Sequence, residues 1–365
     1  MTIREKVSKL AVMINEAEKP VLIVGNGCRN KGLVEALNMP TFLTWASIDI
    51  LDDNHPLNLR DFGITANRAS NFILKEADLI IALGTRLDSH EVMGNWRTGK
   101  LVNVDIDESE LHPDADLKIE MDANRLLKAI NMETFPVGKG WPEWLAKCKK
   151  VKSCKQTDFQ YRFIEELSNQ ANSNAVIITD AGQTLTWTMQ SWKIKEGQRL
   201  FSAFNHSPMG YAVPASIGAA FAKPKSQIIA ITGDGGLQMN LQELQTIKGY
   251  NLPIKIFVLD NNGYGMIKQT QSDWPESLEQ GVACEPKMAK LSDVAKCFGF
   301  RYYEMSDNLL DSLPQALNEN VPTLIRVVIK DHSKISPKLK FGDEMTDLSP
   351  KITEDEKNKI IEALK

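Results

Sequence analysis

Residues 228–263 read IIAITGDGGLQMNLQELQTIKGYNLPIKIFVLDNNG, which is two apolar runs, each followed by a polar loop containing glycine. The runs at 228–232 and 254–259 have the length and the β-branched content typical of buried strands. Between them, leucine and isoleucine recur at every third position until Gly249, which predicts a helix over 237–249. This order predicts two parallel strands whose loops lie side by side at the carboxyl edge of a sheet, where open α/β sheets bind ligands.

The two loops carry groups that suit a divalent cation holding a phosphate. Asp234 offers a charged oxygen, the Asn261 amide a neutral one, and the main-chain carbonyl of Gly263 a third. Mg²⁺ takes such oxygen ligands and keeps places for substrate phosphates. Gly235 and Gly236 have no Cβ, so phosphate oxygens can approach their N–H groups. The tripeptide GDG alone is common in turns, but together with the second loop it predicts a Mg²⁺–diphosphate site.

These loops resemble the thiamine diphosphate signature, and the residues around them resemble the large subunit of acetolactate synthase and its relatives. The resemblance runs over essentially the whole chain and is most specific between Thr179 and Gln271. The stretches that carry it are Thr179-Asp180-Ala181-Gly182-Gln183, Met209-Gly210-Tyr211-Ala212-Val213-Pro214-Ala215, Gly265-Met266 with Gln269, and Ile335-Ser336-Pro337-Lys338-Leu339 with Phe341-Gly342.

The resemblance implies which residues contact thiamine diphosphate. Met209 would support the bent cofactor, and the carbonyl of Ser207 would accept a hydrogen bond from its amino group. Met266 and Gln269 would face the thiazolium and the substrate. The alternatives are an ordinary core methionine for Met209 and a solvated helix residue for Gln269. The other implied cofactor contacts are Gly182, Gln183, Gly233, Gly235, Gly236, Tyr264 and Gly265.

The resemblance also implies the reaction, which is decarboxylation of a 2-oxo acid followed by protonation or by transfer to a second carbonyl. Thr184, Thr270 and Ser207-Pro208 depart from the family pattern and indicate a paralogue with another substrate. Family enzymes place a catalytic glutamate in a pyrimidine-binding domain, and no acid of this sequence matches it by motif. We therefore expect a separate pyrimidine-domain polypeptide to complete a homo- or hetero-oligomer. A non-catalytic cofactor-binding or regulatory subunit, or a truncated fragment, is the alternative.

The predicted fold class is α/β, with two domains that each contain a mainly parallel sheet flanked by helices. The first would be a Rossmann-like middle domain and the second a thiamine diphosphate-binding domain. The expected segments are the middle domain at 1–132, a linker at 133–158, the diphosphate-binding domain at 159–330 and a C-terminal tail at 331–365.

Gly25-Asn26-Gly27 follows an apolar run in the first domain but lacks the third glycine of the dinucleotide fingerprint. A tight turn after a buried strand would also account for it. In acetolactate synthases the similar domain holds FAD, and the residues that match that site are Gly25, Gly27, Arg86, Asp88 and Asp105. FAD, ADP and no nucleotide all stay open, because relatives keep the fold without the cofactor. A nucleotide-binding oxidoreductase built on this domain is a rival function, against which the intact Asp234–Asn261 pair argues.

Composition narrows the classes of partner. A net charge of −4 and scattered Lys and Arg residues give no case for nucleic acid. The N-terminus lacks a signal-peptide core, and no apolar run reaches the length of a transmembrane helix. The five cysteines lack metal or redox spacing and read as reduced thiols. We therefore expect a cytoplasmic protein that does not associate with membranes.

Overall fold

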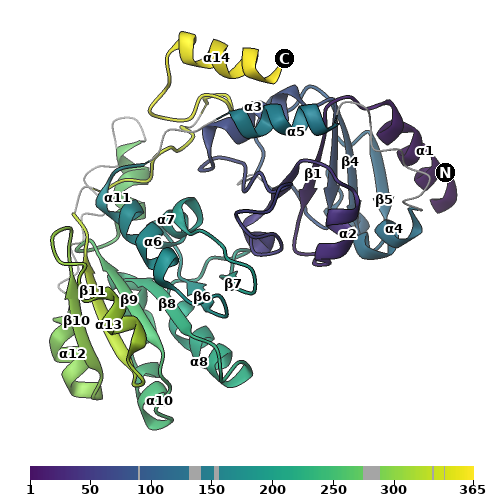
Figure 1. The fold of residues 1–365 in the computed structure, drawn as a ribbon. Helices are drawn as coiled ribbons and strands as arrows, with labels where there is room; N and C mark the ends of the chain where they lie inside the picture. The colour runs from purple at the N-terminus through teal and green to yellow at the C-terminus, as the bar shows by residue number, and fades with distance from the viewer. Residues whose placement is uncertain (89–90, 131–140, 152–155, 274–287, 331–332, 341) are drawn as a thin grey trace. The chain divides into compact units, whose positions relative to one another are not determined.

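The computed structural model describes residues 1–365 except 89–90, 131–140, 152–155, 274–287, 331–332 and 341. The chain forms two compact units (Figure 1). The first comprises Met1–Lys155 with Ser336–Lys365, and the second comprises Gln156–Ile335. Residues 336–365, which the sequence suggested as part of a separate tail, therefore belong to the first unit. Helix α5 (Trp141–Lys150), which lies in the expected linker, belongs to it as well.

The first unit contains a parallel sheet with the strand order β2-β1-β3-β4-β5. Every residue of β1 and β3 is buried, as expected for apolar strands that are covered on both faces. The strands are β1 (Pro20–Val24), β2 (Thr41–Leu43), β3 (Leu79–Leu83), β4 (Lys100–Asp105) and β5 (Leu117–Glu120). The helices are α1 (Ile3–Glu16), α2 (Lys31–Ala36), α3 (Arg68–Glu76), α4 (Ala123–Ala129), α5 and α14 (Glu354–Leu364).

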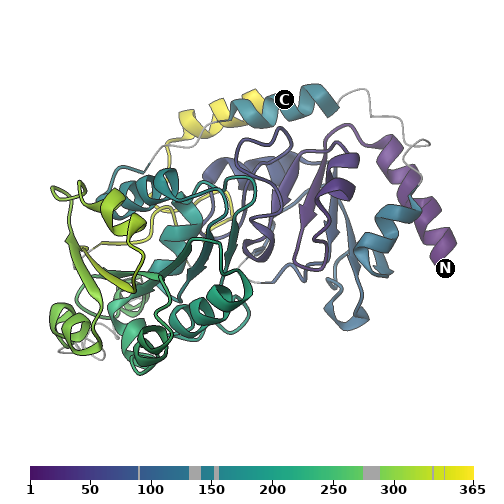
Figure 2. The same cartoon turned by 60° about the horizontal axis from the view of Figure 1, so that its bottom comes forward.

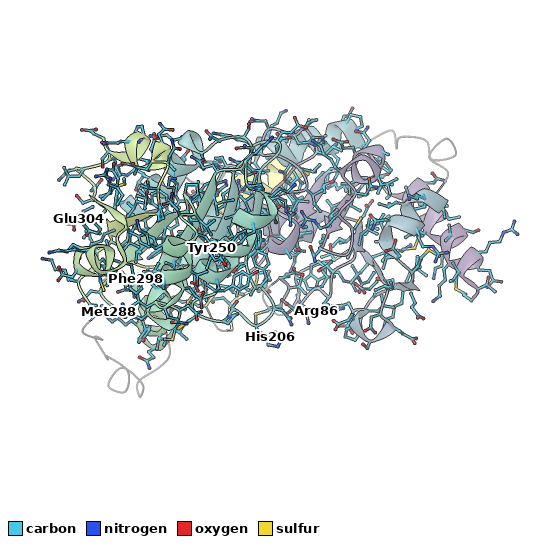
Figure 3. All side chains as sticks on the ribbon, turned by 90° about the horizontal axis from the view of Figure 1, so that it is seen from below. Arg86, His206, Tyr250, Met288, Phe298 and Glu304 are labelled. Atoms are coloured by element: carbon cyan, nitrogen blue, oxygen red, sulfur yellow. The ribbon has the colours of Figure 1, made fainter. Side chains whose placement is uncertain are left out.

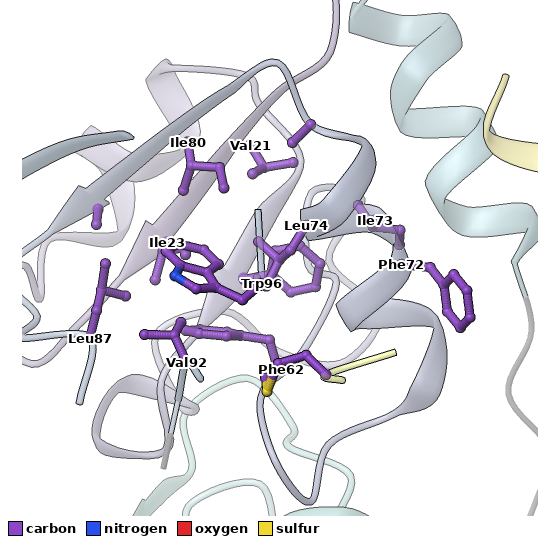
Figure 4. Packing of buried hydrophobic residues seen from close by; sticks show 14 of the residues in the cluster. Val21, Ile23, Phe62, Phe72, Ile73, Leu74, Ile80, Leu87, Val92 and Trp96 are labelled. Carbon is purple, nitrogen blue, oxygen red and sulfur yellow. The ribbon is translucent and has the colours of Figure 1, made fainter. Parts of the chain in front are cut away.

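One face of this sheet carries the apolar core drawn in Figure 4. Val21 and Ile23 of β1 belong to the same buried cluster as Ile80 of β3, Phe72 of α3 and Trp96. The C-terminal segment contributes to the same core with Leu339, Met345, Leu348 and Leu364. Residues far apart in the sequence thus share one hydrophobic core, which explains why 336–365 form part of this unit.

Polar side chains of α3 also hold the C-terminal segment. The Arg68 guanidinium donates hydrogen bonds to the carbonyls of Leu348 and Pro350. Asn71 Nδ2 donates to the carbonyl of Met345 at 2.7 Å. Arg68 and Asn71 are both buried. No main-chain N–H of the described residues donates to these three carbonyls, and the two side chains supply the missing donors.

The second unit contains a parallel sheet with the strand order β10-β11-β9-β8-β6-β7 (Figures 1 and 2). Its strands are β6 (Val176–Thr179), β7 (Arg199–Phe201), β8 (Ile228–Gly233), β9 (Lys255–Asp260), β10 (Arg301–Met305) and β11 (Thr323–Val328). Its helices are α6 (Phe159–Gln170), α7 (Gln183–Ser191), α8 (Ala212–Ala222), α9 (Asp234–Met239), α10 (Glu243–Gly249), α11 (Gly265–Ser272), α12 (Leu291–Phe298) and α13 (Leu313–Asn318).

Helices cover both faces of this second sheet. On one face, Ile256 and Val258 of β9 belong to a core cluster with residues of α8, α10 and α12. On the other face, Phe257 lies 5.9 Å from the ring of Phe163 on α6. Alternate residues of β9 thus pack against helices on opposite faces of the sheet, as the two-residue period of a strand requires.

The predicted helix over 237–249 is wrong, because the segment forms two helices, α9 and α10. Asn240 separates them, with φ of −132° and ψ of 38°. Its Nδ2 atom donates to the carbonyl of Gly210 at 2.9 Å. The break spans residues 240–242, and the Asn240 side chain links it to the segment that precedes α8. The first helix begins at Asp234, so the predicted metal ligand lies in its first turn.

Among the residues that the structure describes, no helix combines the length and the apolar character needed to cross a bilayer. Cys28, Cys148 and Cys297 are free thiols. Burial raises the pKa of Cys28 to about 11. Cys28 is therefore an unreactive core residue at neutral pH. The other two cysteines, Cys154 and Cys284, lie outside the described residues.

Candidate functional site

The carboxyl ends of β6, β8 and β9 meet at one edge of the second sheet, because these strands are parallel neighbours. The loops that follow them lead into α7, α9 and α11. A pocket lies at this edge, lined by the ends of these strands and by the loops and helices that follow them.

This pocket brings most of the predicted site residues together. The predicted residues that line it are Gly182, Gln183, Met209, Gly233, Asp234, Gly235, Gly236, Asn261, Gly263, Tyr264, Gly265 and Met266. Ser207 and Gln269 do not line it. Ser207 is exposed with a φ of 41°, whereas Gln269 is buried. The remaining lining residues, which were not predicted as site residues, are Asp180, Ala181, Thr184, Trp187, Leu259 and Ile267.

Asp234 connects the two loops that were predicted to bind metal. Its Oδ2 atom accepts a hydrogen bond from the Gly263 N–H at 2.7 Å, and its Oδ1 atom accepts one from its neighbour Gly235 at 2.8 Å. The pKa of Asp234 is raised to about 6, because burial and the nearby carboxylate of Asp260 outweigh the two N–H groups, which lower it. Among the described residues no cationic side chain pairs with Asp234. A bound divalent cation would stabilise such a buried carboxylate.

Asn261 is 7% exposed, and a hydrogen bond determines which of its side-chain atoms is available to bind a cation. Its Nδ2 atom donates to Gln183 Oε1 at 2.9 Å. Its Oδ1 atom receives no hydrogen bond within the described part of the chain. The carbonyl of Gly263 accepts the Gly265 N–H at 3.1 Å and keeps a second lone pair. The carboxylate, amide and carbonyl oxygens together form a donor set that suits Mg²⁺.

No group of three His, Cys, Asp or Glu side chains that could hold a metal occurs in the described ranges. The described residues that line the pocket include two carboxylates, Asp180 and Asp234, and no Lys, Arg or His. A free diphosphate would be repelled by these charges. A cation that bridges Asp234 to the phosphates removes this repulsion. The residues present therefore fit a diphosphate that is bound through a divalent metal.

Asp180 holds the walls of the pocket together, although it was not predicted as a site residue. It is 1% exposed. Its Oδ1 atom accepts from the N–H groups of Ala181 at 2.8 Å and Gly210 at 2.9 Å. Its Oδ2 atom accepts from Ala212 N–H at 3.3 Å and Thr232 Oγ1 at 2.9 Å. The signal in the sequence was an acid directly after a buried strand, where only main-chain and hydroxyl donors can satisfy its charge.

Packing of the chain against itself also requires the glycines of the GDGG stretch. A Cβ on Gly236 would lie 2.7 Å from Thr232 Oγ1, and one on Gly235 would lie 2.6 Å from Tyr264 Cε1. Both distances are too short for real Cβ contacts. The approach of phosphate is one reason for glycine at these positions, and the close packing of the loops is a second reason.

Comparison with known proteins agrees with this geometry. Residues 180–327 match the family model described as "Thiamine pyrophosphate enzyme, C-terminal TPP binding domain". Residues 7–130 match the central domain of the same enzymes. The chain belongs to the thiamine pyrophosphate enzyme family. The predicted fold class of two α/β domains with parallel sheets is thereby confirmed.

Within the thiamine pyrophosphate enzymes, the chain is similar to acetolactate synthases, which confirms the predicted resemblance. It is 31% identical to the acetolactate synthase isozyme 1 large subunit of Escherichia coli (strain K12), over 94% of this chain and 64% of that protein. It is 30% identical to the probable acetolactate synthase large subunit of Methanocaldococcus jannaschii, over 94% of this chain and 63% of that protein. It is 30% identical to the acetolactate synthase large subunit of Lactococcus lactis, over 94% of this chain and 64% of that protein. The chain thus spans less than two thirds of the length of these relatives.

The residues that the resemblance assigned to FAD lie at the carboxyl edge of the first sheet. They are Gly25 and Gly27 after β1, Arg86 and Asp88 after β3, and Asp105 at the end of β4. A Cβ on Gly25 would lie 2.2 Å from the carbonyl oxygen of Gly84. The exposed Arg86, labelled in Figure 3, pairs with Asp88 at 3.6 Å and with Glu110 at 3.4 Å. Internal contacts account for these residues, and FAD binding stays a prediction.

Proposed function

We propose that this chain binds thiamine diphosphate through Mg²⁺ and acts on a 2-oxo acid. The reaction would be decarboxylation followed by protonation or carboligation, as in an acetolactate synthase-like transferase or lyase. The observation that carries the proposal is that the buried Asp234 carboxylate and the available Asn261 Oδ1 atom belong to one pocket, in which the described lining residues include no cationic side chain. Such a site selects a metal-bound anion over a free one.

The pocket residues divide between two tasks in this proposal. Asp234, Asn261 and the carbonyl of Gly263 hold Mg²⁺, and the glycine-rich loops receive the diphosphate. Met209 is 39% exposed, and its Cε atom lies 3.4 Å from where a Cβ on Gly235 would lie, so it supports the cofactor beside that loop. When bound, thiamine diphosphate supplies the stabilisation of the carbanion that decarboxylation needs. The chain binds and orients the cofactor and keeps water from its apolar side.

We further propose that a pyrimidine-binding domain on another polypeptide supplies the catalytic acid in a homo- or hetero-oligomer. The support is that both carboxylates of the pocket have other tasks. Asp180 accepts four hydrogen bonds. Asp234 is the proposed metal ligand, and among the described residues no other Asp or Glu lines the pocket. The free thiols of Cys28 and Cys148 favour a reducing, cytoplasmic location.

Turnover of pyruvate tests the proposal. The purified chain with Mg²⁺ and thiamine diphosphate should be inactive alone and should decarboxylate pyruvate when a pyrimidine-binding domain is added in trans. Turnover of about 1 s⁻¹ or more by the chain alone would exclude the need for a partner. Cofactor binding without turnover of any 2-oxo acid after the domain is added would favour a non-catalytic binding or regulatory subunit.

A further inference from the structure

A relay of amide groups runs behind the pocket from Asn261 to the segment that ends at Ile335. Asn261 Nδ2 donates to Gln183 Oε1 at 2.9 Å. Gln183 Nε2 donates to the Ser333 carbonyl at 3.0 Å and to Gln269 Oε1 at 3.2 Å. Gln269 Nε2 donates to the Ile335 carbonyl at 3.0 Å, and Gln269 Oε1 accepts the Ile335 N–H at 2.8 Å. The two glutamine side chains are each 5% exposed, so water does not replace these bonds.

The main chain at one end of the relay determines the direction of every amide in it. The carbonyls of Ser333 and Ile335 can only accept, and the Ile335 N–H can only donate. Gln269 must therefore present Oε1 to that N–H, and Gln183 must present Nε2 to Ser333 and Gln269. The remaining atom of Gln183, Oε1, faces Asn261, which must then donate through Nδ2. The hydrogen-bond network is what decides the orientation of an amide, because its nitrogen and oxygen are alike in shape.

We propose that Gln183 is a positioning residue that orients the Asn261 amide so that its oxygen is presented to the metal. This inference rests on the proposed function. Mg²⁺ accepts the amide oxygen as a ligand, whereas the amide NH₂ group is a donor with nothing to offer a cation. The hydrogen bond from Asn261 to Gln183 holds the NH₂ group away from the metal position. The family resemblance implies that Gln183 contacts the cofactor directly, and the relay gives it a different task.

The absence of a side chain at Gly265 makes room for this hydrogen bond. A Cβ on Gly265 would lie 2.0 Å from Gln183 Oε1 and 2.3 Å from Asn261 Nδ2. No side chain larger than hydrogen fits beside this hydrogen bond without displacing it. The glycine that was predicted as a cofactor contact thus leaves the space in which the bond between Asn261 and Gln183 forms.

The far end of the relay is itself held in place. Trp187 Nε1 donates to the carbonyl of Lys334 at 3.4 Å, and the Tyr161 hydroxyl donates to the same carbonyl at 3.3 Å. Both aromatic side chains are buried, at 1% and 2% exposure. The segment between Ser333 and Ile335 is therefore a fixed reference for the relay.

A double-mutant cycle tests this role. Gln183→Met removes the acceptor for Asn261 and keeps the volume of the side chain. Asn261→Asp replaces the amide by a carboxylate, whose two oxygens are equivalent and need no orientation. The affinity of the full chain for thiamine diphosphate would be measured by calorimetry as a function of Mg²⁺ for the unaltered chain, both single variants and the double variant. Gln190→Met makes the same change two turns along α7, outside the residues that line the pocket.

We expect Gln183→Met, made as a single substitution, to weaken Mg²⁺-dependent binding of thiamine diphosphate about tenfold. In a chain that already carries Asn261→Asp, the same substitution should weaken binding less than about twofold. Gln190→Met should have no effect on binding. An equal loss in both backgrounds would overturn the inference and indicate that Gln183 contacts the diphosphate directly. No loss in either background would overturn it as well. If the unaltered chain showed no Mg²⁺-dependent binding, the proposed function would fail, and the inference would fail with it.

Discussion

Asp180→Asn is the substitution for which the structure gives the most specific expectation. The variant keeps the shape of the side chain but replaces one carboxylate oxygen by an NH₂ group. All groups that contact Asp180 in the described structure are donors, namely the N–H groups of Ala181, Gly210 and Ala212 and the hydroxyl of Thr232. The hydroxyl can rotate and accept instead, whereas the N–H groups cannot.

The magnitude follows from this inventory. The least costly orientation of the new amide places its NH₂ group toward Thr232 and Ala212, so that only the Ala212 N–H, at 3.3 Å the longest of the four hydrogen bonds, loses its acceptor. A buried donor without an acceptor costs about 1–3 kcal/mol, and the bonds that remain lose the contribution of the charge. We therefore expect Asp180→Asn to lower the free energy of unfolding by about 2–4 kcal/mol.

Denaturant unfolding monitored by circular dichroism measures this change, and calorimetry with Mg²⁺ and thiamine diphosphate measures its effect on the pocket. Thr232→Val is the matched control, because it removes a single hydroxyl donor and should cost only about 1 kcal/mol. The free energy of unfolding of Asp180→Asn could instead lie within about 0.5 kcal/mol of the value for the unaltered chain. That result would refute the expectation, because Asp180 would then not hold together the segments at Ala181, at Gly210–Ala212 and at Thr232.

Two further predictions concern stability. Arg68→Met should lower the free energy of unfolding of the first unit by about 2–4 kcal/mol, because the carbonyls of Leu348 and Pro350 lose their donors; an unchanged transition of that unit in denaturant would contradict this. Burial lowers the pKa of Lys255 from 10.5 to about 8. Between these two pH values the unfolded chain therefore binds more protons than the native chain. The free energy of unfolding, measured relative to that of Lys255→Met, should rise by up to about 3 kcal/mol from pH 8 to 10.5. A difference between the two chains that does not change with pH would disprove this prediction.

The sequence predicted the edge of the second sheet well, because the relevant signals are local. Apolar runs ending at Thr232 and Leu259 identify the strands, and parallel strands bring the loops that follow them to one edge. Asp234 and Asn261 could therefore be placed in one pocket without knowledge of any tertiary contact.

The features that were missed depend on partners far along the chain. The periodic helix is interrupted at 240–242, where Asn240 bonds the carbonyl of Gly210, 30 residues earlier in the chain. Gln269 occupies a helical position that pattern alone allows to be solvated, and it is buried because it binds both main-chain groups of Ile335. Arg68 holds carbonyls that lie about 280 residues later in the chain. Periodicity and spacing contain no record of such contacts.

The measurement that tests the central claim most directly is calorimetric titration of the purified chain with thiamine diphosphate, in Mg²⁺ and again after EDTA, for the unaltered chain and for Asp234→Asn. The account predicts Mg²⁺-dependent binding that EDTA abolishes and that Asp234→Asn weakens at least about a hundredfold. The thermal unfolding temperature of Asp234→Asn should stay close to that of the unaltered chain, because removing a buried carboxylate whose pKa is raised to about 6 offsets the acceptor that the Gly235 or the Gly263 N–H loses. Binding that survives both EDTA and Asp234→Asn would contradict the assignment of this edge as a metal–diphosphate site.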